Sequence, residues 1–262
     1  MKTEIENVLI KNRSSFHPVI NFNPSEEKLF HFDFSSTNKE LTLADITNTQ
    51  IFSQYINKKL EIEHAKFGIG GYNEDRVLYK RSSLFEPSES SGSFIFGGGW
   101  DGASPRSIHL GIDVWGPEGT EVFAPVGGMV HSFAFNDNFG DYGATIILKH
   151  QLDTIVFHTL YGHVSLEDIA QLHQGKYFSR GELIAHFGKP AENGCWPPHL
   201  HFQVIGDMNL KEGDYPGVCA ISERKKFTLN CPDPDLILNM MQYTLPAQAF
   251  TIFTSQIDQH GN

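Results

Sequence analysis

Between residues 120 and 205 the chain alternates short runs of strand-forming residues with turn residues, and this pattern limits the fold more than any other feature. The runs are rich in Val, Ile, Phe and Thr, which favour strands. Glycine, asparagine and aspartate separate them, as is typical of tight turns. The five strands that we predict are 120–124, 129–135, 144–149, 154–161 and 200–205. Many short strands with glycine-rich connections predict a mainly β fold, a sandwich or a barrel.

The flanking regions predict a smaller amount of mixed structure. Residues 28–34 alternate as a strand does, and 43–60 carries apolar residues near helical spacing, with Thr42 as a plausible N-cap. Residues 87–106 are rich in Ser and Gly and predict a long loop, either a lid or a linker. We divide the chain into an α+β N-terminal region with this loop (1–104), a β domain (105–206) and a C-terminal extension packed on the core (207–262).

Two histidines, His199 and His201, lie one residue apart at the last predicted strand. Because alternate strand residues face the same side, the two imidazoles would point together while their apolar neighbours face a core. Far upstream, His109 and Asp113 stand four residues apart. Two imidazoles and one carboxylate suit a catalytic zinc ion, which keeps its fourth position open for water.

The chain has 13 histidines, and a His-x-His pair alone is more often two hydrogen-bonded core residues than a metal site. The surrounding motifs favour the metal site. In chain order they are IHLGIDV (108–114), GTEVFAP (119–125), TLYGHVS (159–165), GELIA (181–185) and HLHF (199–202). This series, over about 105–206, resembles the lysostaphin-type zinc endopeptidases, which cleave peptide cross-links in bacterial peptidoglycan. The resemblance implies a two-sheet antiparallel β sandwich with its site in a groove over one sheet.

Matched motif by motif, the resemblance implies that His109, Asp113 and His201 hold Zn²⁺. It also implies that His163 and His199 are catalytic histidines outside the ligand set. The zinc would lower the pKa of a bound water and polarise the scissile carbonyl. The two catalytic imidazoles would share proton transfer and stabilisation of the oxyanion, and the sequence leaves open which does which.

The remaining candidates are weaker. Five further histidines have no metal-ligand spacing and are interpreted as surface or hydrogen-bonded core residues, namely His131, His150, His158, His173 and His186. The chain has no Gly-x-Ser-x-Gly elbow and no His-Glu-x-x-His motif. Cys195 lies near the histidine pair but lacks a Cys-x-x-Cys partner, so we interpret it as a bystander.

Composition bounds the setting. The 20 basic and 31 acidic side chains give a net charge of −11, which argues against nucleic acid and anionic membranes as partners. Residues 1–22 lack the apolar core of a signal peptide, and the chain has no apolar run long enough for a membrane anchor. Three cysteines, an odd number, suit a reducing compartment. We therefore expect a cytoplasmic, bacterial protein that acts on a peptide or a peptidoglycan fragment, with its oligomeric state left open.

Two alternatives to the zinc peptidase remain. One is a non-catalytic binding or regulatory module on the same fold, although all five site positions are filled. The other is a cytosolic metal hydrolase of a small amino compound. Residues 70–76, 193–199 and 213–217 are similar to the peptidase-like middle segment of large bacterial fusion proteins. That segment lies between a phosphotransferase-like and a class III aminotransferase-like domain, which favours the second alternative.

Overall fold

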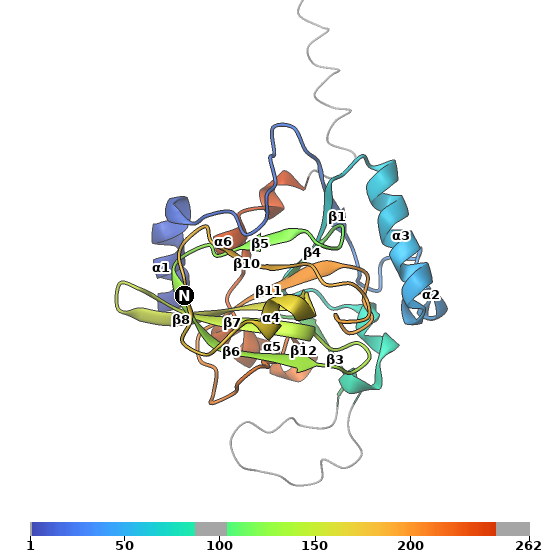
Figure 1. The fold of residues 1–262 in the computed structure, drawn as a ribbon. Helices are drawn as coiled ribbons and strands as arrows, with labels where there is room; N and C mark the ends of the chain where they lie inside the picture. Colours follow the sequence, from blue (N-terminus) through green and yellow to red (C-terminus); the bar gives the residue numbers. More distant parts are fainter. Residues whose placement is uncertain (1, 87–103, 245–262) are drawn as a thin grey trace, which may run out of the picture.

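An eight-stranded sheet forms the centre of the computed structural model, which describes residues 2–86 and 104–244 (Figure 1). In spatial order its strands are β1 (Leu29–Phe32), β2 (Phe67–Gly70), β4 (Ile112–Trp115), β11 (His199–Ile205), β8 (Ile155–Val164), β7 (Gly143–Leu152), β6 (Gly128–Asn136) and β9 (Tyr177–Phe178). Two small sheets pair β5 (Glu121–Phe123) with β10 (Leu183–His186), and β3 (Arg106–His109) with β12 (Val218–Ala220).

The predicted mainly β class is confirmed, and each of the five predicted strands is present with ends that differ by at most three residues. The large sheet is mixed, because β1 and β2 run parallel while its other neighbours run antiparallel. The predicted strand at 28–34 is β1, so a strand from the N-terminal region belongs to the central sheet. The three-part division of the chain stays a prediction, and most of the predicted loop, 87–103, lies outside the described residues.

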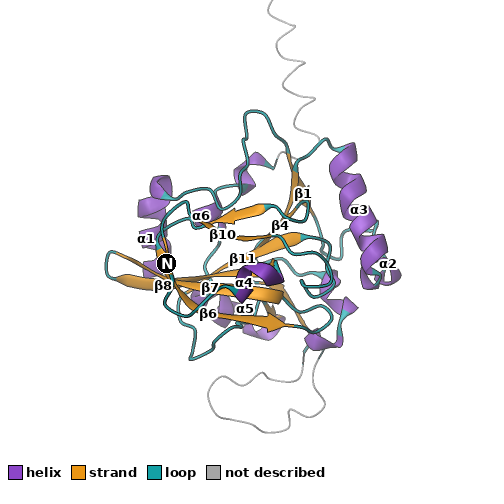
Figure 2. Ribbon diagram, in the orientation of Figure 1, coloured by secondary structure: helices purple, strands orange, loops and turns teal. Residues whose placement is uncertain are grey.

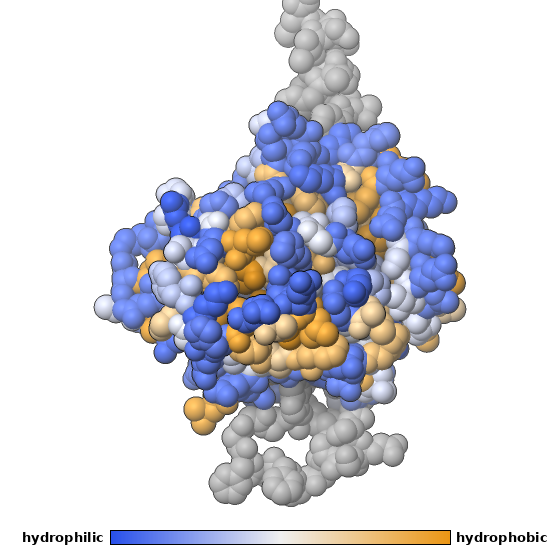
Figure 3. All heavy atoms as spheres, viewed as in Figure 1, coloured by the Kyte–Doolittle hydropathy of each residue, from blue (hydrophilic) through white to orange (hydrophobic). Residues whose placement is uncertain are grey.

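Helices surround the sheet, as the purple segments of Figure 2 show. They are α1 (Glu4–Asn12), α2 (Leu43–Thr47), α3 (Thr49–Ile62), α4 (Leu166–Ala170), α5 (Arg224–Asn230) and α6 (Asp235–Leu238), with 3-10 turns at Arg13–Ser15, Val77–Arg81, Ser83–Phe85, Ile221–Glu223 and Met241–Tyr243. No helix in the described part of the chain is both long and apolar enough to cross a membrane. On the face seen in Figure 3, apolar patches lie between hydrophilic residues.

The single helix predicted over 43–60 is in fact two helices. Thr42 and Asp45 form reciprocal hydrogen bonds that cap α2, as the sequence predicted for Thr42. The backbone of Asn48 is extended, and its side chain accepts hydrogen bonds from two amides of the next turn, so it caps α3. A second cap inside an apolar pattern therefore ends one helix and begins another.

The pairing of four neighbouring strands aligns residues from distant parts of the chain. Gly70 of β2 pairs with Asp113 of β4, Asp113 pairs with His201 of β11, and His201 pairs with Gly162 of β8. The alternate residues of β4 and β11, such as Val114 and Leu200, are fully buried in the main hydrophobic core. One face of the sheet is thus fixed by apolar packing, and the polar residues are left on the other face.

A buried histidine inside this sheet gives stability a pH dependence. His150 of β7 is 2 % exposed; its Nδ1 hydrogen bonds to the Gly127 carbonyl at 3.0 Å and its Nε2 to the Thr159 hydroxyl at 2.7 Å. Burial lowers the pKa of His150 from 6.5 to about 4. Between these two values the unfolded chain binds a proton that the folded chain does not, so the free energy of unfolding falls as the pH falls through this range.

We expect urea denaturation at about pH 5 to give a free energy of unfolding lower than at about pH 7.5, with His150 contributing on the order of 1–3 kcal/mol to the difference. His150→Gln retains a polar side chain that does not titrate, so its pH-dependent loss should be smaller by that amount. An equal loss in the parent and the variant would mean that His150 does not carry this dependence.

Candidate metal centre

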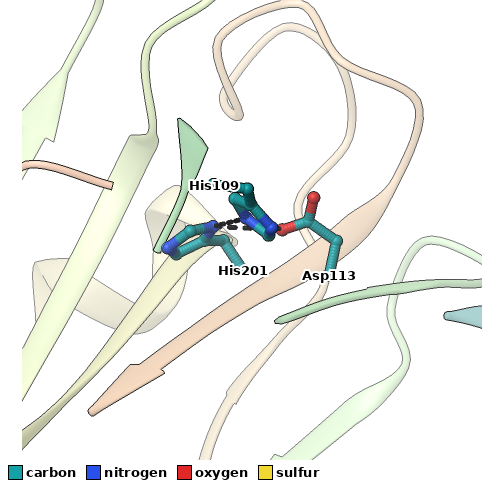
Figure 4. A group of neighbouring side chains, drawn as sticks. All are labelled: His109, Asp113 and His201. Carbon is teal, nitrogen blue, oxygen red and sulfur yellow. Dashed lines mark hydrogen bonds and ion pairs between the residues drawn. The ribbon is translucent and has the colours of Figure 1, made fainter. Parts of the chain in front are cut away.

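Three side chains from three strands converge above the sheet (Figure 4). His109 Nε2 lies 3.0 Å from His201 Nδ1 and 3.2 Å from Asp113 Oδ1, and His201 Nδ1 lies 3.0 Å from the same oxygen. All three side chains are buried. They form the one group of three or more possible metal-binding side chains found within residues 2–86 and 104–244. Far apart in sequence, the three candidate ligands therefore meet in space.

A backbone carbonyl fixes the tautomer of His109. Its Nδ1 lies 3.0 Å from the carbonyl oxygen of Gly71, which can only accept a hydrogen bond, so Nδ1 carries the proton. Burial, followed by the positive charge of Arg76, lowers the pKa of His109 to about 4. The ring is therefore neutral at neutral pH, and its Nε2 directs a lone pair at the other two side chains.

A glutamine fixes the tautomer of His201 in the same way. The amide nitrogen of Gln203 donates to the Pro216 carbonyl at 3.1 Å and to the Cys231 sulfur at 3.3 Å. This leaves Gln203 Oε1 as the acceptor facing His201 Nε2 at 2.9 Å. His201 Nε2 therefore carries the proton, and Nδ1 directs its lone pair at the cluster.

Three electron-pair donors thus face one another at the centre of the cluster. Although burial alone would raise the pKa of Asp113, the positive charge of the buried Arg76 holds it well below its usual value, so the carboxyl is ionised. Two imidazole lone pairs and one carboxylate oxygen within 3.2 Å repel one another unless a cation lies between them. Nitrogen and oxygen donors of these types fit a divalent metal such as zinc.

The two candidate catalytic histidines lie beside this group. His163 and His199 are buried, and their ring centroids are 4.1 Å apart. His199 stacks on Trp115 with 3.9 Å between centroids and 14° between planes. The Nδ1 atoms lie 2.8 Å from the carbonyls of Asn193 and Pro197 respectively, so both rings carry their proton there and present a lone pair at Nε2.

Burial also decides the charge of these two rings. It lowers the pKa of His199 to about 4 and the pKa of His163 well below its usual value. The neighbouring imidazoles lower the pKa of His163 further, because two positive rings at this distance repel. Both side chains are therefore neutral at neutral pH, which is the form that can accept a proton at Nε2.

A pocket of about 280 Å³ opens onto the cluster. Four of the five predicted site residues line it, namely Asp113, His163, His199 and His201. Its other walls include Tyr142 and, from the N-terminal region, Leu78, Tyr79, Leu84 and Phe85. The N-terminal region therefore shapes the space in front of the candidate ligands.

Sequence reasoning assigned no role to two residues that hold the candidate ligands in place. Arg76 is 2 % exposed and donates from Nη1 to Asp113 Oδ2, but no pattern in the sequence links these two positions. Strand alternation places Gln203 on the same face as the histidine pair, which was a usable signal, but its hydrogen bond to His201 depends on where Pro216 and Cys231 pack.

The weaker candidates lie outside the cluster. Of the five other histidines, His150 is a hydrogen-bonded core residue, and His186 hydrogen bonds to Asp168. Cys195 is a free, half-buried cysteine whose carbonyl accepts hydrogen bonds from Thr49 and Arg81. These placements agree with the interpretation of the residues as structural.

Residues 107–212 match the model of Peptidase family M23. The matched part holds all five candidate site residues and the strands that carry them. Over these matched residues the fold and the site define a metallopeptidase-type domain that is similar to the lysostaphin-type M23 family.

Solved structures with similarity to this chain include M23 proteins. A zinc-containing peptidase from Vibrio cholerae is 28% identical over 37% of this chain and 27% of its own, with a TM-score of 0.30. The catalytic domain of lysostaphin from Staphylococcus simulans is 18% identical over 67% and 97%, with a TM-score of 0.31. The catalytic domain of the prophage-encoded M23 protein EnpA from Enterococcus faecalis is 19% identical over 51% and 98%, with a TM-score of 0.32.

The chain thus covers about a quarter of the length of the Vibrio peptidase. The comparison with curated proteins finds no match.

The close packing around His201 leads to a prediction about Gly111. A Cβ atom at this position would lie 2.5 Å from His201 Cε1 and 2.8 Å from the Phe202 carbonyl oxygen. We expect Gly111→Ala to lower the free energy of unfolding by about 1–3 kcal/mol, since overpacking forces side chains and backbone to shift. Gly71→Ala is the matched control, because the nearest atom to its Cβ would be 3.9 Å away. Equal stability of the two variants in urea denaturation would contradict this account.

Proposed function

We propose that this protein is a zinc-dependent hydrolase that cleaves a peptide or amide bond. The observation that carries the proposal is the convergence of three electron-pair donors, from His109, Asp113 and His201, in a buried site that opens into a pocket. When bound, Zn²⁺ supplies a Lewis acid that activates water and polarises a carbonyl group. The match of residues 107–212 to a peptidase family supports the same reaction type.

The division of roles follows from the hydrogen bonds of the histidines. His109 and His201 use one ring nitrogen for an outer acceptor and direct the other at the cluster, which is the arrangement of an oriented metal ligand. His163 and His199 are anchored through Nδ1 on backbone carbonyls, and both line the pocket. We assign to these two the transfer of protons at Nε2 and the stabilisation of the oxyanion.

We propose a peptide, of the kind found in peptidoglycan fragments, as the substrate. Similarity to lysostaphin, whose structure is described as that of an antimicrobial peptidase, supports this class. A second candidate is a small amino compound with an amide bond. The pocket of about 280 Å³ favours this second candidate. N-terminal residues such as Tyr79 and Phe85 line one side of it, and a space of this size suits a short molecule better than a polymer.

Metal analysis tests the ligand assignment. We expect about one zinc ion per chain in the parent protein and almost none in His201→Ala, because a tetrahedral site with three protein ligands loses most of its affinity with one of them. His131→Ala is a matched control, since this histidine is partly exposed on β6 and lies outside the cluster. A parent protein that takes up no metal, even when zinc is added, would favour the non-catalytic module instead.

Turnover tests the two histidines assigned to proton transfer. We expect His163→Ala and His199→Ala to keep their zinc and to lose about 10²- to 10⁴-fold in kcat, the usual contribution of general acid–base catalysis. The assay would compare peptidoglycan fragments, short peptides and small amides. Loss of zinc from either variant as complete as in His201→Ala would overturn the division into ligands and proton carriers.

A further inference from the structure

The two carboxylate oxygens of Asp113 have different surroundings. Oδ1 faces both imidazoles of the cluster, whereas Oδ2 points away from them (Figure 4). Arg76 binds this second oxygen through Nη1, and the guanidinium Nε donates to Glu74 Oε2 at 2.6 Å. Arg76 is 2 % exposed; both hydrogen bonds are charge-assisted, and the one to Asp113 is buried.

The same segment also orients His109. Arg76 Nη2 lies 3.4 Å from the carbonyl oxygen of Gly71, which accepts the hydrogen bond from His109 Nδ1 at 3.0 Å. A Cβ atom on Gly70 would lie 2.5 Å from Arg76 Nη2, so a glycine is needed for the guanidinium to lie this close to β2. Two of the three candidate ligands are thus held by residues 70–76, which precede the part of the chain that matches the family model.

We propose that Arg76 is a positioning residue that makes Asp113 bind the metal through one oxygen only. This inference rests on the metal site of the proposed function. A carboxylate can bind a metal with one oxygen or with both, and a catalytic zinc site needs a position left for water or substrate. By occupying Oδ2, the guanidinium keeps the second oxygen off the metal and so keeps that position open.

Charge alone does not explain this arrangement. Glu74 pairs with Arg76, so the two side chains together add little net charge near the cluster. Moving Asp113 Oδ2 towards the metal would leave the buried guanidinium without one of its partners, which is strongly unfavourable. The effect of Arg76 is therefore on the geometry of the carboxylate more than on the charge of the site.

Arg76→Gln separates the two contacts of the arginine. The glutamine amide nitrogen occupies the place of Arg76 Nε and can still donate to Glu74, but it falls two bonds short of the Nη1 atom that binds Asp113. We expect this variant to bind Co²⁺ and to absorb visible light more weakly than the parent, because four-coordinate cobalt absorbs more strongly than cobalt with extra ligands. Peptidase activity should fall by about 10- to 100-fold, as is usual when the outer partner of a ligand is removed.

Two further variants accompany this measurement. Arg76→Lys places a positive group near Oδ2 and should restore most of the absorption. Arg81→Gln is the matched control, since Arg81 is a buried arginine of the following 3-10 turn. It binds the Cys195 carbonyl and stacks on Trp196, and no contact with the three candidate ligands is found. Its cobalt spectrum should equal that of the parent.

The outcomes distinguish this inference from the proposed function. A parent protein that binds neither Co²⁺ nor Zn²⁺ would refute the metal site itself. A parent that binds one ion, with an Arg76→Gln spectrum identical to its own, would refute the role of Arg76 and leave the metal site in place. If Arg76→Gln does not fold, a crystal structure of the zinc-loaded parent decides the matter: one bound oxygen of Asp113 with Arg76 on the other supports the inference, and two bound oxygens overturn it.

Discussion

The site depends on the antiparallel pairing of β4 with β11, which places Asp113 directly opposite His201. Neighbouring residues on the two strands, including Val114 and Leu200, face the main core, so apolar packing fixes the register. A shift of one residue would turn every side chain to the opposite face and bury the ligands among aliphatic groups. The hydrophobic core and the candidate metal centre are therefore two results of a single register.

One ring nitrogen of each of the four central histidines has a defined hydrogen-bond acceptor, and this determines which nitrogen carries the proton. The Gly71 carbonyl sets the tautomer of His109, and Gln203 sets that of His201. Backbone carbonyls do the same for His163 and His199. Because these acceptors direct the N–H protons outwards, the ring lone pairs are directed at the cluster or at the pocket, and burial lowers the pKa of His109, His163 and His199 so that these three rings are neutral. These acceptors each bind one ring nitrogen, and so leave the other nitrogen of each histidine available to bind a metal or a proton.

The N-terminal region takes part in this outer layer. Strand β2 pairs with β4, which brings Gly71 and Arg76 against the cluster. Residues of the following 3-10 turns line the pocket. Residues that precede the part of the chain matching the M23 family thus contact the candidate ligands within that part. Residues that follow β2 therefore have two roles: some hydrogen bond to the candidate ligands, and others line the pocket.

The sequence by itself determined the mainly β class, the approximate places of five strands and the residues of the candidate site, because strand periodicity and ordered motifs are local signals. Alternation on β11 alone placed His199, His201 and Gln203 on one face. The sequence did not reveal the break at Asn48 or the contact of Arg76 with Asp113. The first depends on which capping side chain forms its hydrogen bonds. The second depends on the pairing of β2 with β4, which brings together two residues that are 37 positions apart in sequence. Tertiary structure decided the second feature, because it is a contact between two residues whose local sequences do not indicate one another.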